Sequence, residues 1–154
     1  MHPTYVAVVG PASPERPDTT DAAHEAGRLL AERGFVVVTG GLGGVMAAAA
    51  AGAHEAGGTA VALLPGARRE EASPGHTVVI PTGMGEMRNA LVVRSADAVL
   101  AIGGAWGTLS EIALAARTGV PVFAVGSWDL PGPEVVPCAT VADAVALLGE
   151  RLGR

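Results

Sequence analysis

The chain has 154 residues and a formal net charge of −5, with 49% hydrophobic residues but only 3% aromatic ones. That length is typical of one domain with a core of its own, so we expect residues 1–154 to form a single domain packed mainly with Ala, Val and Leu. Nucleic-acid binding depends on a basic surface, which a net negative charge does not indicate, so we expect no nucleic-acid partner.

The contents of cysteine, histidine and lysine argue against several kinds of site. Cys138 is the only cysteine, which excludes a disulfide framework and a Cys-x-x-Cys metal or redox site within the chain. The four histidines are isolated and none forms a His-Glu-x-x-His pair, so we expect no metal and no cofactor. The sequence contains no lysine, which excludes a Schiff-base lysine and a Gly-Lys-Ser/Thr phosphate loop.

The predicted elements alternate between short apolar strands and helical patterns along the chain. We predict strands at residues 5–9, 35–38, 59–64, 77–80, 98–102 and 120–125, and helices at 17–34, 45–55, 85–94, 108–117 and 141–152. The polar segment 65–76 and the Pro/Gly-rich segment 126–137 are predicted as connections. Continuous Val/Ile/Leu strands are typical of burial on both faces, so the fold class is α/β: a Rossmann-like, doubly wound parallel sheet with helices on both faces.

One uncharged stretch, residues 35–53, is long enough to cross a bilayer. Four glycines interrupt it, with β-branched residues before them and alanines after them, and this asymmetry favours a strand, a turn and a helix. The first residues lack a basic region ahead of a long apolar stretch, so we predict no signal peptide. We therefore expect a cytoplasmic protein without a membrane partner.

Two glycine clusters open predicted helices, one after Thr39 and one after Ile102. A glycine-rich turn at a helix start directs unpaired N–H groups and partial positive charge at one place, where phosphate binds well. The same turns also occur simply to pack a helix closely on its sheet, and spacing alone does not decide between the two. The first strand is followed by GPASPE rather than Gly-x-Gly-x-x-Gly, which argues against a dinucleotide site.

Glu111 has two interpretations. Thr108-Leu-Ser-Glu111 matches a capping box, in which the fourth residue bonds back to the amide of the first, and the local pattern favours this structural role. Alternatively, the carboxylate faces a ligand held by the glycine loop before it.

Arg88 falls in the first turn of its predicted helix, where a cation opposes the helix dipole. This placement, beside Asn89 and at the carboxyl edge of the sheet, favours a polar pair that faces a ligand. A salt bridge from Arg88 to Glu86 is the alternative. The apolar residues at helical spacing nearby are predicted to be core: Met84, Met87 and Leu91.

Three stretches together resemble the LOG family of cytokinin-activating nucleoside 5′-monophosphate phosphoribohydrolases, in particular the bacterial branch that includes molybdenum cofactor carrier-like proteins. They are GGLGGVMAAAAAGAHEAGG, MRN followed by Asp97, and GGAWGTLSE, within a likeness that covers about residues 6–125. The family motif Pro-Gly-Gly-x-Gly-Thr-x-x-Glu places Gly103 at the proline and Ala105 at the second glycine. Asn89 stands where the family usually has lysine.

The resemblance implies hydrolysis of the N-glycosidic bond of a nucleoside 5′-monophosphate, giving free base and ribose 5-phosphate. It implies that Arg88 and Glu111 are catalytic, with Glu111 at the ribose and Arg88 fixing the base or phosphate. The residues implied to bind phosphate or nucleotide are Gly40, Gly41, Gly43, Gly44, Asn89, Gly103, Gly104, Ala105, Trp106, Gly107 and Thr108.

Two other functions stay open: a protein that binds a nucleotide or the molybdenum cofactor without cleaving it, and a structural module whose glycines only pack helices. The family is typically dimeric, so we expect a homodimer or a larger homo-oligomer. The alanine-rich helix at residues 45–53 is the predicted apolar contact face.

Overall fold

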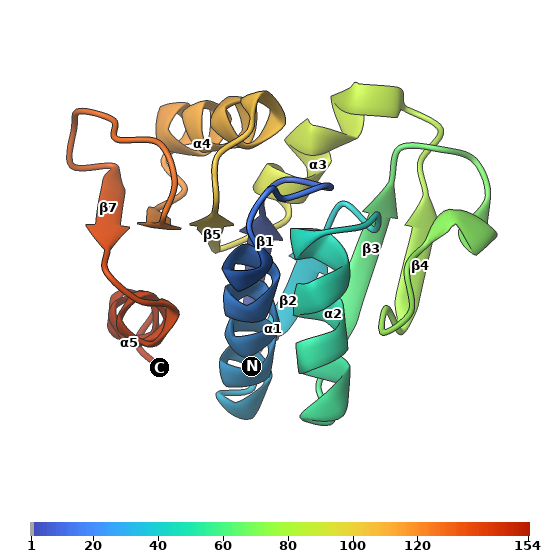
Figure 1. Ribbon diagram of the computed structural model, residues 1–154, viewed down its shortest axis with the longest axis horizontal. Helices are drawn as coiled ribbons and strands as arrows, with labels where there is room; N and C mark the ends of the chain where they lie inside the picture. Colours follow the sequence, from blue (N-terminus) through green and yellow to red (C-terminus); the bar gives the residue numbers. More distant parts are fainter. Residues whose placement is uncertain (1) are drawn as a thin grey trace.

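A computed structural model describes residues 2–154 as a seven-stranded sheet with helices on both sides (Figure 1). The strands are β1 (Tyr5–Val9), β2 (Val36–Thr39), β3 (Ala60–Leu64), β4 (Val78–Pro81), β5 (Ala98–Ile102), β6 (Val122–Val125) and β7 (Val135–Cys138). The α-helices are α1 (Pro17–Glu32), α2 (Val45–Glu55), α3 (Arg88–Arg94), α4 (Trp106–Thr118) and α5 (Val141–Arg151). Two 3₁₀ turns are η1 (Arg69–Glu71) and η2 (Gly85–Met87).

The strand order is β4-β3-β2-β1-β5-β6-β7, and every neighbouring pair is parallel. One hydrophobic cluster joins α1, α2 and α5 to the sheet, and a second joins α3 and α4 to its opposite face. The chain therefore winds outward in both directions from the central pair β1 and β5, which confirms the predicted doubly wound α/β fold. Loops that follow β1 and β5 diverge there, at the place where such sheets bind ligands.

Small residues bring α1 and α2 into backbone contact on one face of the sheet (Figure 1). A Cβ added at Gly27 would collide with the carbonyl oxygen of Ala49, and one added at Gly52 would collide with that of His24. Val45, Met46, Ala49, Ala50, Gly52 and Ala53 are buried. Most of the alanine-rich face of residues 45–53 is thus packed inside the molecule, and its contact with a second copy stays a prediction.

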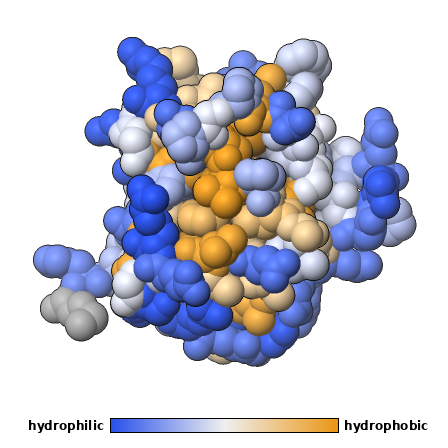
Figure 2. Space-filling view, turned by 90° about the vertical axis from the view of Figure 1, so that its left-hand side faces the viewer, coloured by the Kyte–Doolittle hydropathy of each residue, from blue (hydrophilic) through white to orange (hydrophobic). Residues whose placement is uncertain are grey.

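The connection predicted at residues 126–137 contains the start of an edge strand, β7. Pro137 lies within β7, where the missing N–H is tolerated because the outer side of an edge strand has no neighbour. Figure 2 faces this edge and shows apolar surface near its centre, surrounded by largely polar surface. The other bounds differ by a few residues, and the helix predicted at 85–94 begins as the 3₁₀ turn η2.

The sheet face on the side of α3 is only partly covered over β2, β3 and β4: α3 contacts β3, but Val78 and Ile80 of β4 are exposed. A hollow of about 460 Å³ lies there, lined almost wholly by apolar side chains: Tyr5, Val36, Val38, Val61, Leu63, Val78 and Ile80, with Thr59 and Ser95. Parallel sheets ordinarily have helices packed over both faces. The apolar hollow therefore marks a part of this sheet that the chain's own helices leave uncovered.

No helix among residues 2–154 combines the length and the apolar character that crossing a membrane requires. The stretch 35–53 forms β2, a turn and α2, as predicted.

Substituting Gly27→Val tests the contact between α1 and α2. We expect the free energy of unfolding to fall by about 2–3 kcal/mol, because the added side chain meets backbone that cannot move aside alone. Urea denaturation followed by circular dichroism measures this. The control is Ala47→Leu on the half-exposed side of α2, expected to change stability little; equal effects of the two substitutions would contradict the assignment.

Candidate functional site

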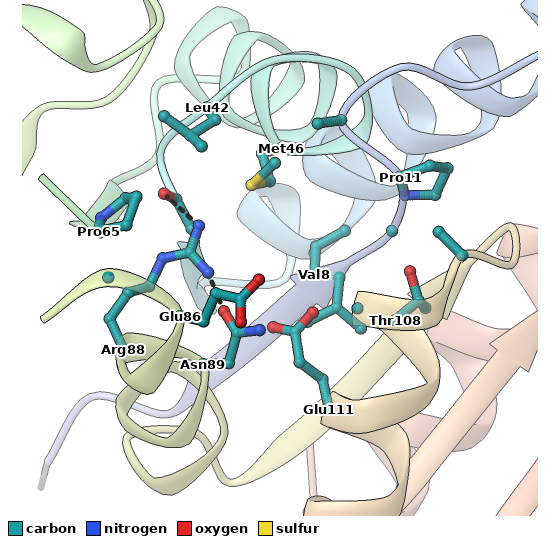
Figure 3. Close-up of a pocket in the computed structure, with 17 residues that line it drawn as sticks. Val8, Pro11, Leu42, Met46, Pro65, Glu86, Arg88, Asn89, Thr108 and Glu111 are labelled. Atoms are coloured by element: carbon teal, nitrogen blue, oxygen red, sulfur yellow. Dashed lines mark hydrogen bonds between the residues drawn. The ribbon is translucent and has the colours of Figure 1, made fainter.

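A cavity of about 470 Å³ opens at the carboxyl end of the sheet, between β1 and the first turns of α3 and α4 (Figure 3). Loops after β1, β2 and β3 complete its wall. The lining residues are Val8, Val9, Gly10, Pro11, Ala12, Gly40, Leu42, Met46, Pro65, Gly85, Glu86, Arg88, Asn89, Ala105, Gly107, Thr108 and Glu111. The cavity is therefore at the point predicted from strand order, where the crossovers diverge.

The structure gathers about half of the predicted site residues around this cavity. Gly40, Arg88, Asn89, Ala105, Gly107, Thr108 and Glu111 line it, whereas Gly41, Gly43, Gly44, Gly103, Gly104 and Trp106 do not. Several of the latter shape the loops behind the wall. Gly41, Gly44 and Gly103 adopt positive φ angles of 82°, 61° and 76°, which other residues rarely adopt.

The start of α2 is closed by the chain itself. Val45 N–H donates to the carbonyl oxygen of Pro11 at 3.1 Å. A Cβ added at Gly44 would collide with the carbonyl oxygen of Pro11, so the β1–α1 loop sits directly on this helix end. The first glycine cluster therefore serves close packing of loop on helix, one of the two interpretations left open by its sequence.

The start of α4 is open to the cavity. Its first helical residue is Trp106, and no side chain caps the helix. The amides of its first turn have no partner within the helix, because the regular bonding pattern begins only with Leu109 N–H to Ala105 oxygen at 3.0 Å. Thr108 Oγ1, on a residue that is 2% exposed, has no hydrogen-bond partner in the described chain. Unsatisfied donors thus converge on one wall.

The capping-box interpretation of Glu111 is wrong. The helix begins at Trp106, so Thr108 lies inside the first turn instead of at the N-cap, which is Ala105. The carboxylate of Glu111 lines the cavity, and no hydrogen bond joins it to the other cavity residues (Figure 3).

Arg88 is buried at the start of α3, opposite Glu111 (Figure 3). Its Nη2 donates to the carbonyl oxygen of Gly40 at 3.3 Å, its Nη1 donates to Asn89 Oδ1, and its Nε has no partner in the described chain. Burial lowers the pKa of the guanidinium, and the carboxylate of Glu111 acts in the opposite direction. No ion pair to Glu86 forms among residues 2–154, so the alternative of a salt bridge is not supported.

Burial raises the pKa of Glu111 to about 7, against the opposing attraction of Arg88. The residue is 8% exposed, so water stabilises its charged form poorly. Near neutral pH the carboxyl group is therefore present in both protonated and ionised forms. A group with this property can take up and release a proton near neutral pH.

A polar network outside the cavity holds the loop that carries Gly40. Thr39 Oγ1 accepts from Gly41 N–H at 2.9 Å and lies 2.6 Å from His76 Nε2. His76 Nδ1 lies 3.0 Å from the carbonyl oxygen of Ser73, and burial lowers the pKa of this histidine. Neutral His76 fits both contacts, with Nδ1 donating to Ser73 and Nε2 accepting from Thr39. Sequence reasoning missed this network because its members lie 37 residues apart.

Trp106 leaves the cavity open. Its side chain is 78% exposed and packs against Trp128, with ring centroids 5.1 Å apart. Trp128 Nε1 donates to the carbonyl oxygen of Ala105 at 3.1 Å and so braces the glycine loop from behind.

Other cavity residues escaped the sequence analysis. Pro11, Leu42, Met46, Pro65 and Glu86 line the cavity, although none of them was predicted to be a site residue. Only their positions after strands of a doubly wound sheet could have indicated them. Among residues 2–154, no three His, Cys, Asp or Glu side chains gather as a metal site requires.

A family model described as the SLOG cluster4 family matches residues 3–144. The chain belongs to the SLOG cluster4 family. This confirms the resemblance to the LOG family and its molybdenum cofactor carrier-like branch.

Two solved structures share the whole fold of this SLOG protein. The molybdenum cofactor binding protein of the phototrophic bacterium Rippkaea orientalis is 31% identical, with a TM-score of 0.94 over 99% of both chains. The molybdenum cofactor carrier protein of Chlamydomonas reinhardtii is also 31% identical, with a TM-score of 0.90 over 99% of this chain and 100% of that one.

A curated relative from rice carries an enzyme name. The probable cytokinin riboside 5′-monophosphate phosphoribohydrolase LOGL9 of Oryza sativa subsp. japonica is 32% identical over 143 residues, or 89% of this chain. The matched part spans 63% of the rice protein, somewhat under two thirds of its length.

Replacing the buried carboxylate by Glu111→Gln should stabilise the protein at high pH. Burial raises the pKa of Glu111 from an ordinary 4.5 to about 7, so the folded state binds more protons than the unfolded state between these values. Wild-type stability therefore falls as pH rises through this window, by on the order of 3 kcal/mol at most.

The gain in unfolding free energy for Glu111→Gln over wild type should grow from pH 4.5 to about pH 7 and then level off. Denaturation at a series of pH values measures it, with the exposed Glu150→Gln as a control that shows no such trend. A Gln variant that is equally less stable at every pH would contradict the environment assigned to Glu111.

Proposed function

We propose that the protein hydrolyses the N-glycosidic bond of a nucleoside 5′-monophosphate to free base and ribose 5-phosphate. The proposal depends chiefly on one observation: Glu111, with its pKa raised to about 7, shares a cavity with a buried, incompletely paired Arg88 and an open helix start. The enzyme name of the rice relative supports the same reaction.

The 5′-phosphate would bind at the start of α4. Backbone N–H groups of the first turn and the unpartnered hydroxyl of Thr108 supply donors, and the helix dipole adds favourable positive potential. Gly107 leaves room for an anion because nothing lies within 4 Å of where its Cβ would be. The phosphate would thus fix the ribose within reach of Glu111.

Cleavage breaks the bond from C1′ to the base nitrogen, and the bonding electrons leave with the base. Positive charge develops on the ribose ring, and an ionised Glu111 would stabilise it. Water adds to C1′ and gives one of its protons to ionised Glu111. That proton then passes to the departing base, which restores the carboxylate. Arg88 balances the negative charge that develops during departure, so the net reaction consumes one water.

A protein that only binds its ligand is the second candidate. The two neighbours with the same fold over nearly their whole length are named for binding or carrying the molybdenum cofactor. The open start of α4 would serve a phosphate group equally well in a carrier, and only turnover separates the two functions.

Incubation with AMP, CMP, GMP and a cytokinin riboside monophosphate, followed by chromatography of free base, tests the enzyme. We expect kcat/KM to rise with pH and level off above about 7, because ionised Glu111 acts. Glu111→Gln should lower kcat by about 100-fold or more, whereas Glu150→Gln should have no effect. If a nucleotide or the molybdenum cofactor binds and no base is released, the carrier function is favoured. If neither ligand raises the melting temperature, both the enzyme and the carrier functions are contradicted.

We further propose that a second copy of the chain covers the open sheet face over β2, β3 and β4. Met84, Met87 and Leu91, predicted to be core, are exposed in the structure, with Met87 at 70%. These three residues, here called the apolar ridge, come from the N-cap of η2, from η2 and from α3, whose C-cap Ser95 lines the apolar hollow that contains Val78 and Ile80. A two-fold axis would place the ridge of each copy in the hollow of the other, and η2 also borders the cavity.

Substituting Ile80→Asp tests this interface. The carboxylate would be buried without a partner, so we expect the dimer dissociation constant to rise by about 100-fold or more. Light scattering measures the mass of the particle. Leu147→Glu serves as the control, because the side chain of Leu147 on α5 is exposed and lies outside the proposed interface. A monomeric wild type, or a dimer that is insensitive to Ile80→Asp, would contradict the proposal.

A further inference from the structure

The end of the cavity remote from α4 has a chemistry of its own. Leu42, Met46 and Pro65 give it apolar walls, and Glu86 extends its carboxylate into the middle of the cavity, beside Asn89 (Figure 3). Glu86 comes from the turn η2, whose first residue, Gly85, has a positive φ of 60°; Gly83, before the turn, has a φ of 65°. This end suits a flat ring whose polar edge meets an acid.

The carboxylate of Glu86 is free to bind a ligand. No cation lies within ion-pair distance of it in residues 2–154, although Arg88 is two positions away. A carboxylate here disfavours a second phosphate at this end. It accepts hydrogen bonds only, so it selects for a group that presents N–H donors.

Asn89, three residues after Glu86, offers a hydrogen-bond donor to the ligand, whereas Glu86 offers only acceptors. A guanidinium only donates, so the bond from Arg88 Nη1 fixes the amide of Asn89 with its oxygen toward Arg88. The NH₂ group of Asn89 is left to donate. Glu86 and Asn89, at i and i+3, both line the cavity and together offer two acceptor oxygens beside a donor.

We propose that Glu86 and Asn89 select a ring with a 2-amino-4-oxopyrimidine edge, the edge shared by guanine and pterin. This edge presents a carbonyl oxygen, a ring N–H and an amino group in a row. The carbonyl accepts from Asn89, and the two adjacent donors bind the carboxylate of Glu86. Adenine and cytosine place an acceptor beside a single amino donor, and hypoxanthine lacks the amino group. The inference rests on the proposed function in using the same cavity and phosphate end.

GMP and IMP form the sharpest pair of probes, because they differ only in the 2-amino group. Calorimetry in the Glu111→Gln background avoids turnover. We expect GMP to bind about 10- to 100-fold more tightly than IMP. Glu86→Gln should largely remove this preference by weakening GMP, since a carboxamide accepts only one of the two bonds. Glu150→Gln, exposed and outside the cavity, is the matched control and should leave the preference intact.

The possible results distinguish a failure of this inference from a failure of the proposed function. If GMP and IMP bind equally and Glu86→Gln leaves their ratio unchanged, the assignment of Glu86 is overturned while nucleotide binding stands. If no nucleotide binds wild type or Glu111→Gln, the proposed function itself fails. The monophosphate ester of 6-hydroxymethylpterin distinguishes a pterin ligand from a guanine ligand. If it binds more tightly than GMP and Glu86→Gln abolishes this binding, the ligand is assigned as a pterin. If it binds more weakly than IMP, the ligand is assigned as a guanine nucleotide.

Discussion

The divergence of the chain at β1 and β5 is the constraint from which the site follows. Each parallel strand needs a crossover to reach the next, and the crossovers after β1 and β5 leave toward opposite edges of the sheet. The loops that follow these strands must therefore part, and no element of the fold fills the space between them. The first turns of α3 and α4 border this space and bring Arg88 and Glu111 to it.

Burying these two groups without a direct ion pair destabilises the folded protein. A guanidinium with an unpartnered Nε and a carboxyl group with a raised pKa both lose hydration that the protein replaces only in part. Apolar residues at both positions would fold at least as well. The dense packing of small residues elsewhere, above all between α1 and α2, offsets this penalty and leaves the polar groups available to a ligand.

Most of the fold could be predicted from the sequence, because strands buried on both faces and glycine-terminated helices leave strong local patterns. β7 escaped because its four residues, Pro137 among them, lie at the end of a connection rich in proline and glycine. Arg88 and Glu111 were found, since their chemistry is unusual for their positions. Thr39 and His76 were not, because they contact each other from positions 37 residues apart, and Glu86 was not, because only the three-dimensional structure shows that it lines the cavity. The role of Glu111 was also ambiguous locally: the difference between a cap and a cavity acid depends on a helix start two residues earlier than predicted.

The two glycine-rich helix starts look alike in sequence but differ in what occupies them. Carbonyl oxygens of the β1–α1 loop lie on the start of α2, whereas no group within residues 2–154 bonds to the first-turn amides of α4. Of these two helix starts, only that of α4 is therefore open to an anionic group. A ligand whose two phosphates lie far apart could place only one of them at these two helix starts, whereas a phosphate monoester needs only one.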